Sequence, residues 1–90
     1  MALIASFTNR FQKDIKRAQK RHKDLSKIKA IIDTLINETP LSEKHKDHGL
    51  IGNYAGAREC HVEPDWLLIY VIDKNTITFT RTGTHSDLFK

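Results

Sequence analysis

The apolar run WLLIYVI at residues 66–72 constrains the fold more than any other part of the sequence. Its apolar residues follow one another without the alternation that marks a strand with one solvent-facing side. The run therefore predicts a central strand covered on both faces. Turn-forming segments flank it at 63–65 and 73–75, and strand-like segments at 57–62 and 76–82 lie beyond them. We expect the three strands to form an antiparallel meander.

Two helices are expected before the meander. Thr8 or Asn9 offers an N-cap for a first helix that extends to about Arg21, and a second helix follows from about Leu25 to Asn37. Apolar residues at helical spacing mark one face of each helix: Phe11, Ile15 and Ala18 in the first, and Leu25, Ile28, Ile32 and Leu35 in the second. Residues 2–7 are expected to form a strand-like start, and residues 38–56 are expected to form a long polar loop.

The expected fold is α+β, with a helical hairpin packed on a four-stranded, mainly antiparallel sheet in the order β-α-α-β-β-β. Ninety residues are enough for one domain with one modest core, so residues 1–90 are expected to form a single domain. One cysteine cannot form an intramolecular disulfide. The sequence contains no apolar run of about 20 residues and no signal-like start, so the cytoplasm is the expected location and a membrane partner is not expected.

Positive charge is concentrated in the first third of the chain. The net charge is +4, yet residues 1–30 hold nine lysines and arginines against two aspartates, a net of +7. A basic segment of this kind indicates a polyanionic partner, with RNA or DNA ahead of a membrane surface. The alternative is a solvated helix face with no partner.

Pairing the strands through their turns places several reactive side chains at one end of the sheet. We expect Val62 opposite Leu67 across the first turn and Ile72 opposite Thr76 across the second. The residues gathered at that end are then His61, Asp65, Trp66 and Arg81. Each has a structural alternative, respectively a surface strand residue, a turn cap, a core residue and a snorkelling edge residue.

The C-terminal segment RTGTHSDLFK leaves the sheet at the same end and carries His85 and Phe89. These two residues either complete a site or dock the C-terminus and do no more. Clustering favours a site, because so many reactive groups at one sheet end are an improbable coincidence.

Histidines, an aspartate and an arginine without a serine or cysteine nucleophile suit metal-independent RNA cleavage. Imidazoles act as general acid and base near neutral pH. An arginine binds the phosphate whose charge grows in the transition state. RNA supplies its own nucleophile, the 2′-hydroxyl. Trp66 and Phe89 are expected to hold an unstacked base.

A zinc site is the alternative for some of these residues. His45 and His48 have the spacing of a ligand pair, and Cys60-His61 could supply a second pair. Adjacent residues in a strand point to opposite faces, so Cys60 and His61 cannot easily share one metal. We therefore expect neither a metal nor another cofactor.

Four collinear blocks carry a family resemblance: AQKRHKDLSKIK at 18–29, KDHGL at 46–50, HVEPDWLLIY at 61–70 and RTGTHSDLF at 81–89. On these blocks the chain resembles the YafQ-type toxins of bacterial type II toxin–antitoxin systems, within the RelE superfamily of ribosome-dependent endoribonucleases. The RelE-like microbial RNase fold that this implies agrees with the element order expected above.

The resemblance implies catalytic or substrate-binding roles for a set of residues that includes all of those placed at the sheet end. The set is His48, His61, Asp65, Trp66, Arg81, His85 and Phe89. His48 enters by the resemblance alone. Gly49 stands where a proline often follows the loop histidine, and Cys60 stands where a small residue is expected.

The resemblance implies an mRNA interferase that cleaves mRNA in the ribosomal A site, with the basic first helix on ribosomal RNA. It also implies neutralisation by a cognate acidic antitoxin, and operator DNA binding only through the antitoxin complex. Two alternatives stay open. One is a basic nucleic-acid-binding module without catalysis, and the other is an inactive toxin that retains only antitoxin binding.

Overall fold

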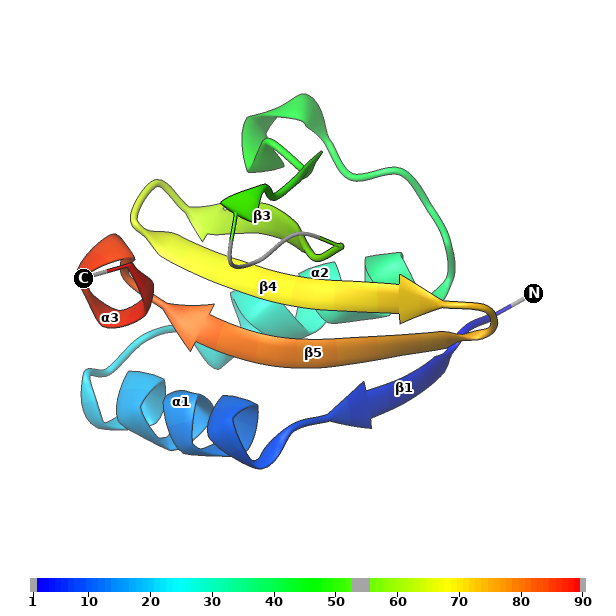
Figure 1. Ribbon diagram of the computed structural model, residues 1–90. Coiled ribbons are helices and arrows are strands. Elements are labelled where there is room, and N and C mark those ends of the chain that lie inside the picture. Colours follow the sequence, from blue (N-terminus) through cyan, green and yellow to red (C-terminus); the bar gives the residue numbers. More distant parts are fainter. Residues whose placement is uncertain (1, 53–55, 90) are drawn as a thin grey trace.

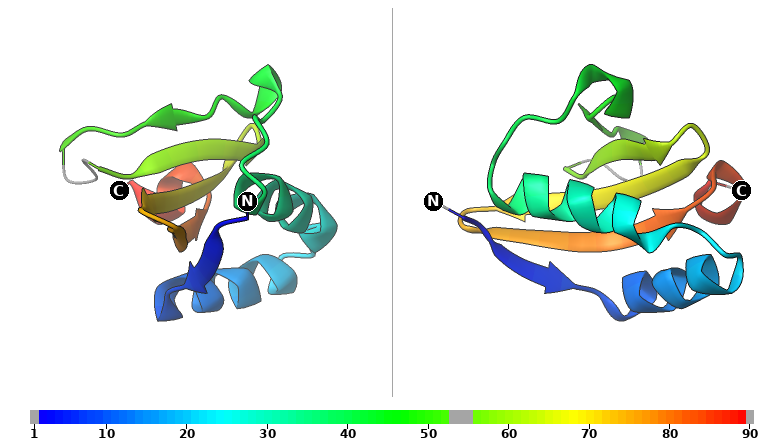
Figure 2. Two further views of the ribbon diagram at one scale, coloured as in Figure 1. Left: turned by 90° about the vertical axis from the view of Figure 1, so that its right-hand side faces the viewer. Right: turned by 180° about the vertical axis from the view of Figure 1, so that it is seen from behind.

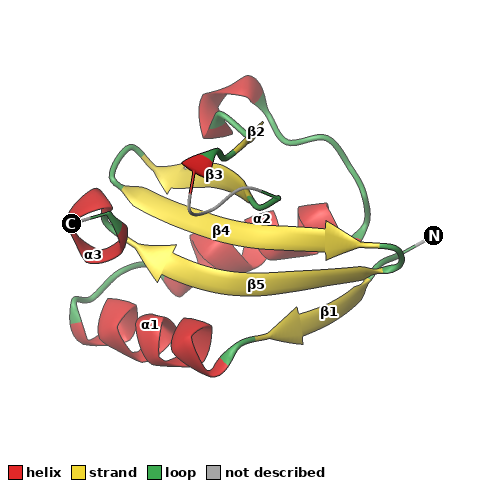
Figure 3. Cartoon of the chain, in the orientation of Figure 1, coloured by secondary structure: helices red, strands yellow, loops and turns green. Residues whose placement is uncertain are grey.

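A mixed sheet of five strands forms the centre of the protein (Figures 1 and 3). The computed structural model describes residues 2–52 and 56–89. The strand order is β1-β5-β4-β3-β2; β1 pairs with β5 in parallel and every other pair is antiparallel. The strands are β1 (Ile4–Phe7), β2 (His48–Gly49), β3 (Arg58–Glu63), β4 (Trp66–Asp73) and β5 (Thr76–Gly83).

The central strand predicted from the apolar run is confirmed. Leu67, Leu68, Ile69 and Tyr70 of β4 are at most 1% exposed. Leu68 and Tyr70 belong to the core between the sheet and the two long helices. Leu67 and Ile69 belong to a second, smaller core on the opposite face. Both faces of β4 are therefore covered, as the absence of alternation requires.

The two expected helices are α1 (Asn9–Lys20) and α2 (Leu25–Ile36). The Thr8 hydroxyl accepts a hydrogen bond from the backbone N–H of Phe11, and the Asp24 carboxylate accepts one from the N–H of Ser26, each at 3.0 Å. These N-caps satisfy backbone donors that the first turn leaves unpaired. Figure 2 shows α1 and α2 on one side of the sheet and the C-terminal helix on the other.

Three short elements were not predicted. The expected loop contains the 3-10 helix η1 (Glu43–His45) and the strand β2, and the C-terminal segment contains α3 (His85–Leu88). The sheet therefore has five strands where four were expected. β2 is two residues long, too short to show any hydrophobic periodicity, and it forms by pairing with the edge of β3.

The expected strand register holds at the first turn, where Glu63 pairs with Trp66, but a register shift at Val62 places His61 opposite Leu67. At the second turn the expected register is wrong by one residue. The pairs nearest the turns are Glu63 with Trp66 and Asp73 with Thr76. Both turns are two residues long, which is the commonest hairpin connection. A register shift at Val62 and another at Thr80 then displace the strands further, so that Leu68 lies opposite Thr82. Such irregularities re-aim the side chains that follow them.

Within the described ranges, no helix combines the length and the apolar character that a membrane crossing requires.

Candidate active site

Three histidines from distant parts of the chain form a cluster beside β3. His48 belongs to β2, His61 to β3 and His85 to α3. The ring centroids of His48 and His61 lie 6.4 Å apart, and those of His61 and His85 lie 6.0 Å apart. The ring of Phe89 lies 6.5 Å from that of His85. We call His48, His61 and His85 the histidine cluster.

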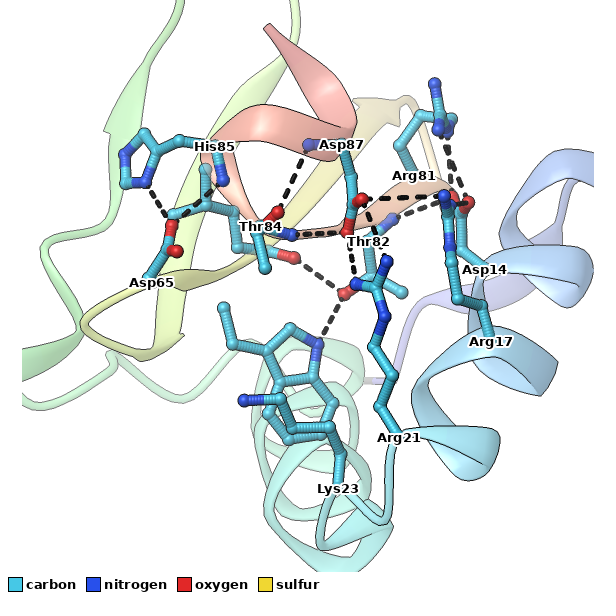
Figure 4. A network of polar contacts seen from close by, with 12 residues as sticks. Asp14, Arg17, Arg21, Lys23, Asp65, Arg81, Thr82, Thr84, His85 and Asp87 are labelled. Atoms are coloured by element: carbon cyan, nitrogen blue, oxygen red, sulfur yellow. Dashed lines mark hydrogen bonds and ion pairs between the residues drawn. The ribbon is translucent and has the colours of Figure 1, made fainter.

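Asp65 holds His85 through one carboxylate oxygen (Figure 4). Oδ1 of Asp65 accepts hydrogen bonds from the backbone N–H of His85 at 2.9 Å and from its Nδ1 at 2.6 Å. These bonds, the backbone one first, hold the pKa of Asp65 below its ordinary value. Because a carboxylate only accepts, Nδ1 carries the proton, and Nε2 is left for a substrate.

The other two imidazoles are held by backbone carbonyls. Nδ1 of His61 donates to the carbonyl of Pro64 at 3.2 Å, and Nδ1 of His48 donates to the carbonyl of Lys46 at 2.5 Å. Their Nε2 atoms lie 3.6 and 3.5 Å from Oε1 of Glu59. One carboxylate therefore faces both imidazoles.

Glu59 is a site residue that the sequence analysis missed. It is 6% exposed, although strand β3 carries a carboxylate at this position. Strand alternation was the available signal, since Glu59 and His61 are two residues apart in β3 and must share a face. A buried carboxylate is costly without partners, and the imidazoles of His48 and His61 both lie within ion-pair distance of Glu59.

Arg81 pairs with a buried aspartate on α1. Nε of Arg81 donates to Oδ2 of Asp14 at 2.7 Å, and the backbone N–H of Thr82 donates to the same oxygen at 3.1 Å. β1 ends at Phe7, opposite Phe79, so the edge of β5 beyond that point is open to Asp14. Figure 4 shows Arg81 turned toward Asp14, with His85 at the opposite side of the network.

Trp66 lies in the core and not in the histidine cluster. Its side chain is 2% exposed, and Nε1 donates to Oγ1 of Thr82 at 3.0 Å. Oγ1 of Thr82 in turn donates to the carbonyl of Leu67 at 2.6 Å. The indole thus ties β4 to the end of β5, where α3 begins. That Trp66 contacts a base stays a prediction.

The short helix α3 is held in place by its own cap and by α1. Thr84 and Asp87 form a capping box, and Arg21 donates to both carboxylate oxygens of Asp87 at 2.7 and 3.2 Å. The Arg21 bond holds the pKa of Asp87 far below its ordinary value. A Cβ at Gly83 would lie 2.9 Å from that of Asp87, so glycine permits this close approach.

Two of the possible zinc ligands, Cys60 and His45, are engaged elsewhere in the fold. Cys60 is fully buried in the core that faces the helices, and burial raises the pKa of its thiol to about 12. His45 donates from Nδ1 to the carbonyl of His61 at 2.7 Å. Among residues 2–52 and 56–89, no group of three His, Cys, Asp or Glu side chains is arranged to hold a metal ion.

A family model described as the bacterial toxin of type II toxin–antitoxin systems, YafQ, matches residues 3–90. The chain belongs to the YafQ family of toxins. The family resemblance drawn from the four sequence blocks is thereby confirmed.

Individual similar proteins match nearly the whole chain in sequence and in structure. The mRNA interferase toxin YafQ of Escherichia coli K12 is 50% identical over 84 residues, which cover 92% of this chain and 91% of the relative. The E. coli DinJ-YafQ toxin-antitoxin complex contains a chain with a TM-score of 0.93, 45% identity and full coverage of both chains. A metal-bound toxin from Helicobacter pylori has a TM-score of 0.90 at 40% identity, covering 97% of this chain and 99% of that one.

Proposed function

We propose that this protein is an mRNA interferase toxin, a ribosome-dependent endoribonuclease that cleaves mRNA in the ribosomal A site. The observation that carries the proposal is that Asp65 holds His85 with its ring centroid 6.0 Å from that of His61. Two imidazoles at this spacing lie within reach of a single phosphodiester group. The curated E. coli relative at 50% identity is named as an mRNA interferase toxin, which supports the same activity.

In the proposed reaction, His85 and His61 perform the two proton transfers. One imidazole removes the proton of the RNA 2′-hydroxyl, whose oxygen attacks the adjacent phosphorus. The other protonates the departing 5′-oxygen as its bond to phosphorus breaks. The products are a 2′,3′-cyclic phosphate and a 5′-hydroxyl. Asp65 orients His85 by accepting a hydrogen bond from Nδ1–H of the imidazole, which leaves Nε2 directed toward the RNA.

The remaining residues bind the RNA or shape the site. Arg81 stabilises the phosphate charge, because its guanidinium carries a fixed positive charge and planar N–H donors that suit phosphate oxygens. Phe89 stacks on an unpaired base beside His85. His48 assists from β2. Trp66, buried beneath the site, supports the end of β5 to which Arg81 belongs.

The basic first helix accounts for ribosome dependence. Lys13, Lys16 and Lys20 are exposed on α1, where they can contact ribosomal RNA phosphates. Such contacts supply the affinity that a small site lacks. The same surface favours the alternative of a nucleic-acid-binding module without catalysis, but that alternative gives no role to the His85–Asp65 pair.

We further propose that a cognate acidic antitoxin neutralises the toxin in the cytoplasm. The solved E. coli complex pairs a chain of this fold with the DinJ antitoxin. A net charge of +7 over residues 1–30 favours an acidic partner segment. Operator DNA would then be bound through the antitoxin complex.

Single-turnover cleavage of one mRNA, on programmed ribosomes and as naked RNA, tests the proposed function. We expect cleavage on ribosomes at least about a hundredfold faster, equivalent to roughly 2.7 kcal/mol. Equal rates on both substrates would contradict ribosome dependence. No cleavage of either would favour the non-catalytic alternative.

A further inference from the structure

A cavity of about 610 Å³ lies beside the histidine cluster, between α2, η1 and the turn from β3 to β4. This volume is within the roughly 300–1,000 Å³ typical of small-molecule sites. His61 lines the cavity and also belongs to the histidine cluster. The cavity is therefore continuous with the candidate active site, and the reaction proposed above leaves it without a role.

Part of the cavity wall is apolar. Ala30 and Ile31 of α2 form one side, and Val62 and Pro64 form the other. Ile31 and Val62 are 4% and 7% exposed, so they belong to the packed core and cannot easily move. A rigid apolar surface of this kind suits the flat face of a nucleobase.

The rim of the cavity is positively charged. Lys44 and Lys46 line it and are exposed, and within the described part of the chain neither ammonium group has an ion-pair partner. The acidic lining residue, Glu63, is paired with Lys27 at 2.8 Å and with Lys23 at 3.3 Å. The rim thus has cationic charge to offer an anion such as a phosphate.

The rim is also fixed to the catalytic strand. The hydrogen bond from His45 Nδ1 to the carbonyl of His61 ties η1 to β3. The register shift at Val62 brings His61 and Val62 to the same cavity, although they are adjacent in the strand. A phosphate bound by Lys44 or Lys46 would therefore lie close to His61.

We propose that this cavity binds one unstacked mRNA nucleotide next to the cleaved bond, with its base on the apolar wall and its phosphate at Lys44 and Lys46. The inference rests on the proposed function. An acidic peptide would also satisfy the lysines, but the sharing of His61 with the histidine cluster favours RNA. The cavity would thereby contribute to sequence preference at the nucleotide beside the cut.

The test uses a trinucleotide RNA with 2′-O-methyl groups on every sugar, which lacks the nucleophile and cannot be cleaved. Its dissociation constant for the full chain is measured by NMR titration at several salt concentrations. For a single strand, each phosphate contact contributes about 0.7 to the slope of log affinity against log salt. The Lys44→Gln variant is expected to lower that slope by about 0.7.

Lys29→Gln is the matched control, because Lys29 is also exposed and lies on α2 outside the cavity lining. Ala30→Phe fills the cavity and is expected to raise the dissociation constant at least fivefold while leaving the salt slope unchanged. Ala30→Ser keeps the space open and should bind as the wild type does. All of these positions are exposed, and thermal unfolding verifies that each variant folds.

The proposal is overturned if the wild type does not bind the trinucleotide, or if Lys44→Gln and Ala30→Phe bind it as their controls do. Variants that bind RNA normally but lose affinity for the antitoxin would assign the cavity to the protein partner and also overturn it. Cleavage on ribosomes separates this failure from that of the proposed function. If the wild type cleaves mRNA and both variants also bind and cleave normally, the nucleotide-site proposal fails while the proposed function stands.

Discussion

Asp65 and His85 are joined twice, because one carboxylate oxygen of Asp65 accepts both the backbone N–H and the imidazole Nδ1–H of His85. The pair links the turn before β4 to the start of α3. It fixes both the position of His85 and the nitrogen that carries its proton. A histidine held in this way presents Nε2 in one direction, which proton transfer requires.

Asp65→Asn should lower cleavage by about 10²-fold or more, because an amide can donate to Nδ1 and stabilise the wrong tautomer. Asp65 is exposed, so the fold should survive the change. Single-turnover cleavage on ribosomes and the pH profile of its rate provide the measurement. Asp73→Asn, at the exposed end of β4, is the control. An unaltered rate and profile would show that Asp65 only caps a turn.

Phe89→Ala should reduce cleavage less than loss of a proton-transfer group, because stacking of a base on an aromatic ring contributes about 1–3 kcal/mol. The neighbouring Leu88→Ala should act differently. Leu88 is 7% exposed in the core beneath α3, so its loss should lower the melting temperature. Cleavage rates per folded molecule, measured beside thermal unfolding, distinguish the two. A Phe89 variant that is unstable but fully active would assign this ring to packing.

The Arg21–Asp87 pair should make the free energy of unfolding fall as the pH is lowered. The pKa of Asp87 is lower in the folded chain than its ordinary value of about 3.9, so the unfolded chain takes up a proton first as the pH falls. The stabilisation is therefore fully present above about pH 5 and is lost as the pH falls toward the folded-state pKa.

Urea unfolding of the wild type and of Asp87→Asn at pH 7 and pH 3 tests this dependence. The difference in free energy of unfolding should be larger at pH 7 than at pH 3. Asp33→Asn, at an exposed position on α2, controls for the loss of one negative charge. A difference that stays constant, or grows in acid, would show that the pair does not hold α3.

Chelation should leave the cleavage step unchanged once ribosomal magnesium is controlled for, since the proposed proton transfers use only side chains. The structurally similar toxin from Helicobacter pylori is metal-bound, so the same measurement tests a metal-dependent alternative for this chain. Activity lost in excess EDTA and restored by zinc would require a metal in the mechanism.

The sequence predicted best those features that repeat along the chain. The apolar run of β4 and the capped helices α1 and α2 each carry a pattern over many residues, and the structure reproduces them. β2 carries no such pattern, because it is two residues long and forms by pairing with β3. The spacing Thr84-x-x-Asp87 is a capping-box signal in the sequence that marks the start of α3.

The placement of site residues depended on details that the sequence pattern does not show. His61, Asp65 and His85 were expected at one end of the sheet, and the structure brings them together there. Arg81 and Trp66 were expected beside them. The register shift at Thr80 instead leaves Arg81 next to Asp14, and Trp66 faces the core. A single irregular residue in a strand changes which face of the sheet the following side chains occupy, and hydrophobic periodicity does not predict such a residue.

The most direct test of the central claim is single-turnover cleavage of ribosome-bound mRNA by the wild type and by His85→Ala, with thermal unfolding and antitoxin binding measured on the same samples. The account predicts a loss of about 10²-fold or more for the variant, an unchanged melting temperature and unchanged antitoxin affinity. Ser86→Ala, at the next exposed position of α3, should behave as the wild type. A stable His85→Ala protein that cleaves at the wild-type rate would contradict the account.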